Sequence, residues 1–112
     1  MQESKAITKY VRISPRKARL AAGLIRGNQV EQALIQLQYA GMKGARLLIK
    51  TLKSAIANAE SAHGADRRNL KVKEVRVDPG SIIKRAKPKN RGGRVSIHKR
   101  TSHFTVVVGT EN

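Results

Sequence analysis

Arginine and lysine side chains supply most of the chemistry available to this chain, and their spacing indicates contacts with phosphate groups. Of 112 residues, 24 are Lys or Arg and 7 are Asp or Glu, which gives a formal net charge of +17. Arg16, Arg19 and Arg26 align along one side of a predicted helix. Arg16 and Lys17 also occupy its first turn, where the helix dipole disfavours cations unless an anion lies beside the free N–H groups. A solvated row of charges is the alternative interpretation.

A second row of cations follows one side of a longer predicted helix. Its members recur at intervals of three or four residues and are Lys43, Arg46, Lys50 and Lys53. Residues three and four apart are neighbours on a helix surface, so these side chains form one continuous stripe. Plain solvation explains this row about as well as nucleic acid does.

The third basic segment, residues 82–103, contains no acidic residue. Its cations are Lys84, Arg85, Lys87, Lys89, Arg91, Arg94, Lys99 and Arg100. Strand-like flanks surround Pro88 and Gly92-Gly93, which predicts a β-hairpin that continues past the body, with arms that reach about 30 Å. Such a ribbon has no core of its own, so we expect bound nucleic acid to fix its shape. A disordered basic loop is the alternative.

The net charge favours nucleic acid as the partner, since soluble domains of this size usually carry a charge of about 2 to 8. A membrane surface is the main competitor, but the chain has no Trp and one Phe to anchor it. With only three aromatic residues it offers no stacking platform for bases. We therefore expect recognition of phosphates, 2′-hydroxyls and the shape of folded RNA.

Catalytic and metal-binding patterns are missing from the sequence. The chain has no cysteine, and His63, His98 and His103 have no carboxylate companions at ligand spacing. The phosphate-binding pattern GxxxxGK[ST] is also missing. We expect no enzyme activity, no cofactor and no metal. The N-terminal segment lacks a signal-peptide core and no apolar run approaches about 18 residues, which predicts a cytoplasmic protein.

Apolar periodicity predicts three helices. The first starts at Ser14-Pro15, ends at Gly27-Asn28 and buries Ala18, Ala21, Leu24 and Ile25. The second spans residues 29–38 and buries Val30, Ala33, Leu34 and Leu37. The third runs from Gly41 to about His63, and its apolar side is Met42, Ala45, Ile49, Leu52, Ile56 and Ala59.

Alternating apolar residues predict strands at residues 5–13, from Leu70 onward and at residues 104–108. The apolar parity changes between Val72 and Val75, which predicts a bulge near Lys73-Glu74. The expected fold is α+β: a small three-stranded antiparallel sheet packed with three helices on one face, plus a long protruding β-hairpin. We expect a single domain over residues 1–112, with a body of about 1–80 and 97–112 and a hairpin of about 80–97.

Four separated blocks of the chain resemble the large-ribosomal-subunit protein L-twenty-two family, bacterial type. They are ISPRKARLAAGLIRG at 13–27, LKSAIANAE at 52–60, VDPGSIIKRAKPKNRGGR at 77–94 and KRTSHFTVVV at 99–108. The blocks run in the family's order over nearly the whole chain.

The resemblance implies a structural constituent of the large ribosomal subunit that supports its assembly. Its body would lie near the exit of the peptide tunnel, and its hairpin tip would line the tunnel wall and touch the nascent peptide. Large-subunit ribosomal RNA and neighbouring ribosomal proteins are the other implied partners. Gly92-Gly93-Arg94 departs from the one Gly and Arg-Ala of many members, and Ala86-Lys87 replaces a more apolar pair, so individual tip contacts stay open.

Together, the cation rows and the resemblance predict two sets of functional residues. The RNA-binding set is Arg12, Arg16, Lys17, Arg19, Arg26, Lys43, Arg46, Lys50, Lys53, Lys84, Arg85, Lys99, Arg100, Ser102 and His103. The tip set is Lys87, Pro88, Lys89, Asn90, Arg91, Gly92, Gly93 and Arg94.

A DNA-bending protein with a basic β-arm is the competing hypothesis, because a proline near an arm tip can wedge between base steps. That hypothesis requires a dimer. The chain has no second apolar face beyond what one core needs, so we expect no stable homo-oligomer.

Overall fold

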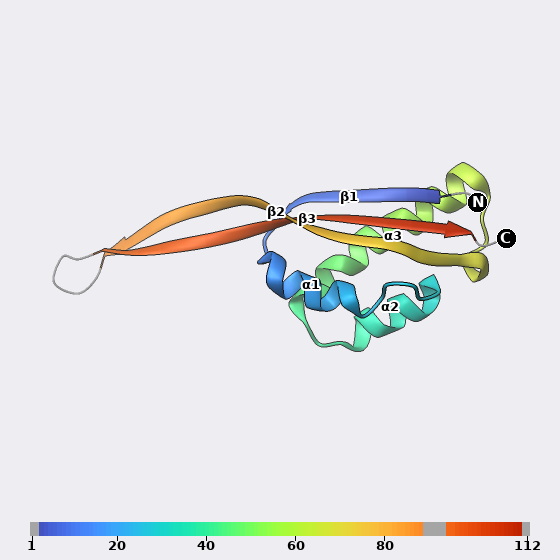
Figure 1. Ribbon diagram of the computed structural model, residues 1–112, viewed down its shortest axis with the longest axis horizontal. Coiled ribbons are helices and arrows are strands. Elements are labelled where there is room, and N and C mark those ends of the chain that lie inside the picture. Colours follow the sequence, from blue (N-terminus) through green and yellow to red (C-terminus); the bar gives the residue numbers. More distant parts are fainter. Residues whose placement is uncertain (1–2, 89–93, 111–112) are drawn as a thin grey trace.

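The computed structural model describes most of the chain. In this part, a three-stranded antiparallel sheet with helices on one face forms the body. The described residues are 3–88 and 94–110, and for 83–88 and 94–99 the backbone alone is described. The elements are β1 (Glu3–Val11), α1 (Pro15–Gly23), α2 (Val30–Tyr39), α3 (Lys43–His63), a 3-10 turn (Arg67–Asn69), β2 (Leu70–Pro88) and β3 (Arg94–Thr110). The strand order is β1-β3-β2 (Figure 1), and the predicted α+β class is confirmed.

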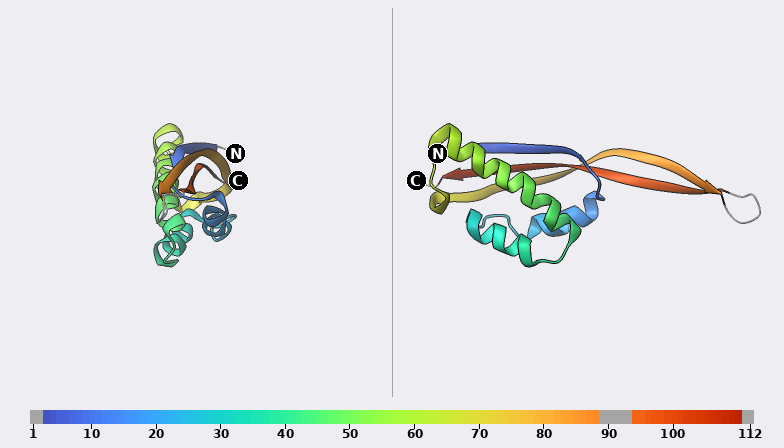
Figure 2. Two further views of the ribbon diagram at one scale, coloured as in Figure 1. Left: turned by 90° about the vertical axis from the view of Figure 1, so that its left-hand side faces the viewer. Right: turned by 180° about the vertical axis from the view of Figure 1, so that it is seen from behind.

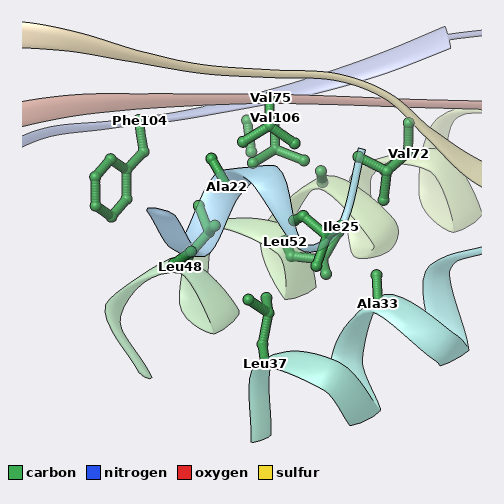
Figure 3. Packing of buried hydrophobic residues seen from close by; sticks show 14 of the residues in the cluster. Ala22, Ile25, Ala33, Leu37, Leu48, Leu52, Val72, Val75, Phe104 and Val106 are labelled. Carbon is green, nitrogen blue, oxygen red and sulfur yellow. The ribbon is translucent and has the colours of Figure 1, made fainter. Parts of the chain in front are cut away.

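The long helix α3 follows its predicted bounds closely, ending at Gly64 in the left-handed conformation with φ of 60°. Leu48 and Ala55 are buried beside the predicted Leu52, whereas Met42 and Ile49 are only partly buried. The buried side of α3 is therefore rotated slightly around the helix axis from the predicted apolar side. The buried side of α3 packs on β1 and β3, and Figure 3 shows its Leu48 and Leu52 in the same core as Phe104 and Val106 of β3.

The end of α1 differs from the prediction. Ser14 caps the helix through its side-chain oxygen, which accepts from the Lys17 N–H, and Pro15 occupies the first turn as expected. The helix ends at Gly23 rather than at Gly27-Asn28. Beyond it, the Gly27 N–H donates to the Val72 carbonyl at 3.0 Å, and the Val72 N–H donates to the Asn28 carbonyl at 2.8 Å. The chain leaves the helix because residues 27 and 28 bond to the outer edge of β2, and Leu24 is consequently 38% exposed.

Two irregularities in β2 decide which side chains face the core. The register shifts between Val72 and Glu74, which confirms the predicted bulge and lets Val72, Val75 and Val77 all be buried. A second shift lies between Pro79 and Ile82. Beyond that point the β2–β3 pairing leaves the helices and continues to Pro88 opposite Arg94. The molecule measures 65 × 25 × 16 Å, and its described termini lie at the end opposite the hairpin (Figure 1).

Side chains of α3 cover the outer edge of β1. The Asn58 amide donates to the Lys5 carbonyl at 3.1 Å, and the His63 ring lies 3.3 Å from the Glu3 carbonyl. The hydroxyls of Thr51 and Thr8 share a 2.8 Å hydrogen bond. An exposed strand edge is a template for pairing with other chains, so these contacts protect it.

Candidate nucleic-acid interface

The first turns of α1 and α3 meet beside the base of the hairpin. Figure 2 shows both helices starting at the end of the body from which the hairpin departs. Gly44 permits this approach, because a Cβ there would lie 3.1 Å from the Ile13 Cδ1 and 3.4 Å from the Ala18 Cα. The close approach of the two helix starts shapes the surface described next.

Two adjoining clefts occupy this end of the body. The first has a volume of about 610 Å³ and is lined by Arg12, Ile13, Ser14, Lys17, Leu20, Met42, Lys43, Gly44, Arg100 and Thr101. The second measures about 520 Å³ and is lined by Ser14, Pro15, Arg16, Lys17, Arg19, Pro79 and Arg100. Because Ser14, Lys17 and Arg100 belong to both, the clefts form one surface, which we call the cation groove.

The cation groove concentrates positive charge without compensating carboxylates among its described lining residues. Its cations are all exposed and are Arg12, Arg16, Lys17, Arg19, Lys43 and Arg100. They come from the β1–α1 connection, the starts of two helices and the base of β3. Such a surface attracts polyanions, and the N-termini of the two helices add the positive ends of their backbone dipoles.

Carboxylates gather elsewhere on the described surface. On the sheet face that the helices leave open, Arg76 lies 3.2 Å from Asp78 and 3.8 Å from Glu74. At the end opposite the hairpin, Arg67 pairs with Glu60 at 2.6 Å. There, hydrogen bonds from the side chain and backbone of Arg68 lower the pKa of Asp66.

Ser102 and His103, both predicted to bind RNA, hold the base of the hairpin to the body. Ser102 is 0% exposed, and its hydroxyl donates to the Ile13 carbonyl at 2.7 Å. The His103 Nδ1 accepts from the Tyr10 N–H at 3.1 Å, and the two rings meet edge to face. Tyr10 has a φ of 57°, and this strained residue breaks the β1 pairing. Ser102 therefore has a structural role in the described fold.

Thr101 and Gly80 complete this joint. The Thr101 hydroxyl donates to the Ser81 carbonyl at 2.6 Å within the irregular part of β2. A Cβ at Gly80 would lie 2.5 Å from the Thr101 Oγ1 and 3.1 Å from the His103 Cε1. A glycine at this position therefore leaves room for the Thr101 and His103 side chains where the β2–β3 register shifts.

Comparison with known proteins decides the family. The sequence model of the family described as Ribosomal protein L22p/L17e matches residues 6–109. The chain belongs to this family. It is 68% identical over 108 residues to the large ribosomal subunit protein uL22 of Protochlamydia amoebophila, covering 96% of this chain and 97% of that protein. Over 105 residues it is 58% identical to the uL22 of Chlamydia trachomatis serovar L2 and 55% identical to that of Chlamydia pneumoniae. Those two alignments cover 94% of this chain and 95% of each relative.

Three more groups of predicted residues lie outside the cation groove of this family member. Arg46, Lys50 and Lys53 are exposed on α3 and extend the row that begins at Lys43 in the cation groove. For Lys84, Arg85, Lys87, Pro88, Arg94 and Lys99 the backbone position in the hairpin is described. The tip residues Lys89, Asn90, Arg91, Gly92 and Gly93 lie outside the described residues.

Neither a membrane-spanning helix nor a cluster of metal ligands occurs in the described part of the chain. No helix there combines the length and the apolar character needed to cross a bilayer. No group of three or more His, Cys, Asp or Glu side chains there is arranged to hold a metal ion.

Arg19 and Arg26, two of the predicted RNA-binding residues, bond to the outer edge of β2. Both donate through Nε and Nη2: Arg19 to the Val77 carbonyl at 3.3 and 3.2 Å, and Arg26 to the Val75 carbonyl at 3.2 and 2.9 Å. A planar guanidinium suits such paired donation. Arg19 of α1 and Arg26 of the turn that follows it therefore cover the edge of β2, and Arg19 also borders the cation groove.

Replacing Arg26 with Met is expected to lower the free energy of unfolding by about 1–2 kcal/mol, because the Val75 carbonyl loses a charged donor. Urea denaturation measures the change. Arg16→Met on the exposed side of α1 is the control, with an expected change within about 0.5 kcal/mol. Equal stability of Arg26→Met and the wild type would show that the edge contact contributes nothing.

Proposed function

We propose that this chain is a structural constituent of the large ribosomal subunit and binds large-subunit ribosomal RNA through the cation groove, the α3 row and the hairpin. The observation that carries the proposal is the family match over residues 6–109, with relatives that bear the name of a large-subunit protein over nearly their whole length. The role is structural and non-enzymatic, and its location is the cytoplasmic ribosome.

The charge distribution supports RNA as the main partner. Each phosphate neutralised by Lys or Arg releases condensed counterions, so a surface with many exposed cations gains affinity in proportion to its contacts. The cation groove borders the base of the hairpin, and the α3 row leads away from it along the body. One chain can therefore touch several RNA segments at once and hold them together during subunit assembly.

The hairpin is proposed to reach into the subunit, with its tip in the wall of the peptide tunnel and in contact with the nascent peptide. Its paired backbone supports this part, since the strands stay in register from Ile82 opposite Arg100 to Pro88 opposite Arg94. The proposed tip set is the one predicted above, from Lys87 to Arg94. Neighbouring ribosomal proteins are further proposed partners, and the chain acts as a monomer.

A binding experiment tests the RNA proposal. The full-length protein is titrated with large-subunit ribosomal RNA fragments and with duplex DNA of equal length, in moderate salt. We expect tighter binding to the folded RNA, because its irregular shape offers phosphates to several basic faces at once. Equal affinities would contradict the proposal, and a stable dimer that bends the duplex would favour the DNA-bending alternative.

A further inference from the structure

The first cleft of the cation groove contains an apolar half that phosphate binding does not explain. Ile13 forms part of its floor and is 6% exposed, while Leu20 is 65% exposed on α1. Met42, which is partly buried, lies at the start of α3. Phosphate oxygens gain nothing from apolar contacts, so a ligand that filled this cleft would need both an anionic and an apolar part.

The polar half of the same cleft is suited to an anion. Lys17, Lys43 and Arg100 line it together with the starts of two helices. Ser14 already caps α1, whereas Met42 provides no side-chain hydrogen bond to the first turn of α3. The first N–H groups of α3 therefore have no side-chain cap, and no described carboxylate lines the cleft.

We propose that the first cleft binds one unpaired nucleotide of RNA, with its base against Leu20, Met42 and Ile13 and its flanking phosphates on Lys17, Lys43 and Arg100. This proposal rests on the proposed function and adds a site to it. The volume of about 610 Å³ lies within the usual range of roughly 300–1,000 Å³ for small-molecule sites. A paired base is stacked within its helix, whereas bases in loops and bulges can be splayed out into a protein.

Aliphatic side chains replace the aromatic ones usual at such sites. The chain has two Tyr and one Phe, and none of them lines this cleft. Contact between a base face and Leu20 or Met42 removes apolar surface from water without stacking. The site would select for an unpaired nucleotide rather than for a base sequence, because every base offers a flat face to apolar side chains.

The test compares full-length variants bound to full-length large-subunit RNA. Leu20→Ser removes the exposed apolar wall of the cleft, and Met42→Ser removes a second part while supplying a good helix cap. Ile35→Ser on α2 is the matched control, because Ile35 is 55% exposed and outside the cleft. Dimethyl sulfate reports base accessibility, and hydroxyl radicals report backbone protection.

We expect at least one unpaired base that the wild type and Ile35→Ser protect. Leu20→Ser and Met42→Ser should need about tenfold more protein for the same protection, since one apolar contact surface is lost. Backbone protection by Leu20→Ser should stay unchanged. Base protection that is the same for all four proteins would overturn the proposal.

A protein segment in this cleft is a different outcome, and it would also overturn the proposal. In that case, on RNA that carries no other ribosomal protein, the protection of no base depends on Leu20. Incorporation of Leu20→Ser into subunits together with other ribosomal proteins nevertheless falls. Failure of the proposed function has its own signature, because the wild type would then protect neither bases nor backbone.

Discussion

Changing Lys17, Lys43 and Arg100 together to Gln is expected to weaken binding to large-subunit RNA about 100-fold near physiological salt. These three side chains line the cation groove and belong to three different segments. Each lost phosphate contact removes one counterion-release step, so the slope of log affinity against log salt should fall by about two to three. Fluorescence anisotropy over a salt series measures both quantities.

The matched control neutralises three cations that already have carboxylate partners. Arg67, Arg68 and Arg76 pair with Glu60, Asp66 and Asp78, respectively. Their change to Gln alters the net charge by the same amount, so it reports the effect of total charge alone. We expect a loss of less than about tenfold. Equal losses in the two triple variants would mean that binding follows total charge and that the groove has no special role.

Deleting residues 83–95 is expected to leave the body folded while removing the proposed tunnel-wall element entirely. The described core lies outside the deleted segment and includes Phe104, Val106 and Val108 of β3. Ile82 and Arg100 are paired, so residues 96–99 become the new connection between the strands. A circular dichroism melt checks the body, and cosedimentation with large subunits after a high-salt wash checks incorporation.

Two results would contradict this separation of body and hairpin. An unfolded body after the deletion would mean that the hairpin stabilises the core. Subunits that contain the shortened protein and show no gap in the tunnel wall would remove the proposed place of the tip. Ile35→Ser serves as a full-length control for handling and incorporation, because it changes one exposed residue on α2.

Local sequence patterns predicted the long helix α3 and the bulge in β2, because both depend mainly on residues that are close together along the chain. The spacing of Ala45, Leu52 and Ile56 predicted α3, since helical periodicity places them on one face whatever packs there. The change of parity after Val72 likewise predicted the bulge. The resemblance in four blocks anticipated the family that the comparisons show.

The roles of individual polar residues depended on distant parts of the chain. Arg26 lies 49 residues before the Val75 carbonyl that it contacts, and Ser102 lies 89 residues after Ile13. No local pattern distinguishes an arginine that binds RNA from one that covers a strand edge. Leu20 could have been noticed in the sequence, because it is a large apolar residue outside the predicted apolar stripe of its helix. Only the folded structure shows that it lines a cleft.

The sequence by itself determined the positive charge, the helix periods, the basic hairpin and the family, because each is a property of composition or of neighbours along the chain. Tertiary structure alone decided that α1 ends at Gly23, that two arginines cover β2 and that an apolar cleft adjoins the cations. Those outcomes come from competition for hydrogen bonds and space between segments far apart in sequence, which becomes defined only when the helices pack on the sheet.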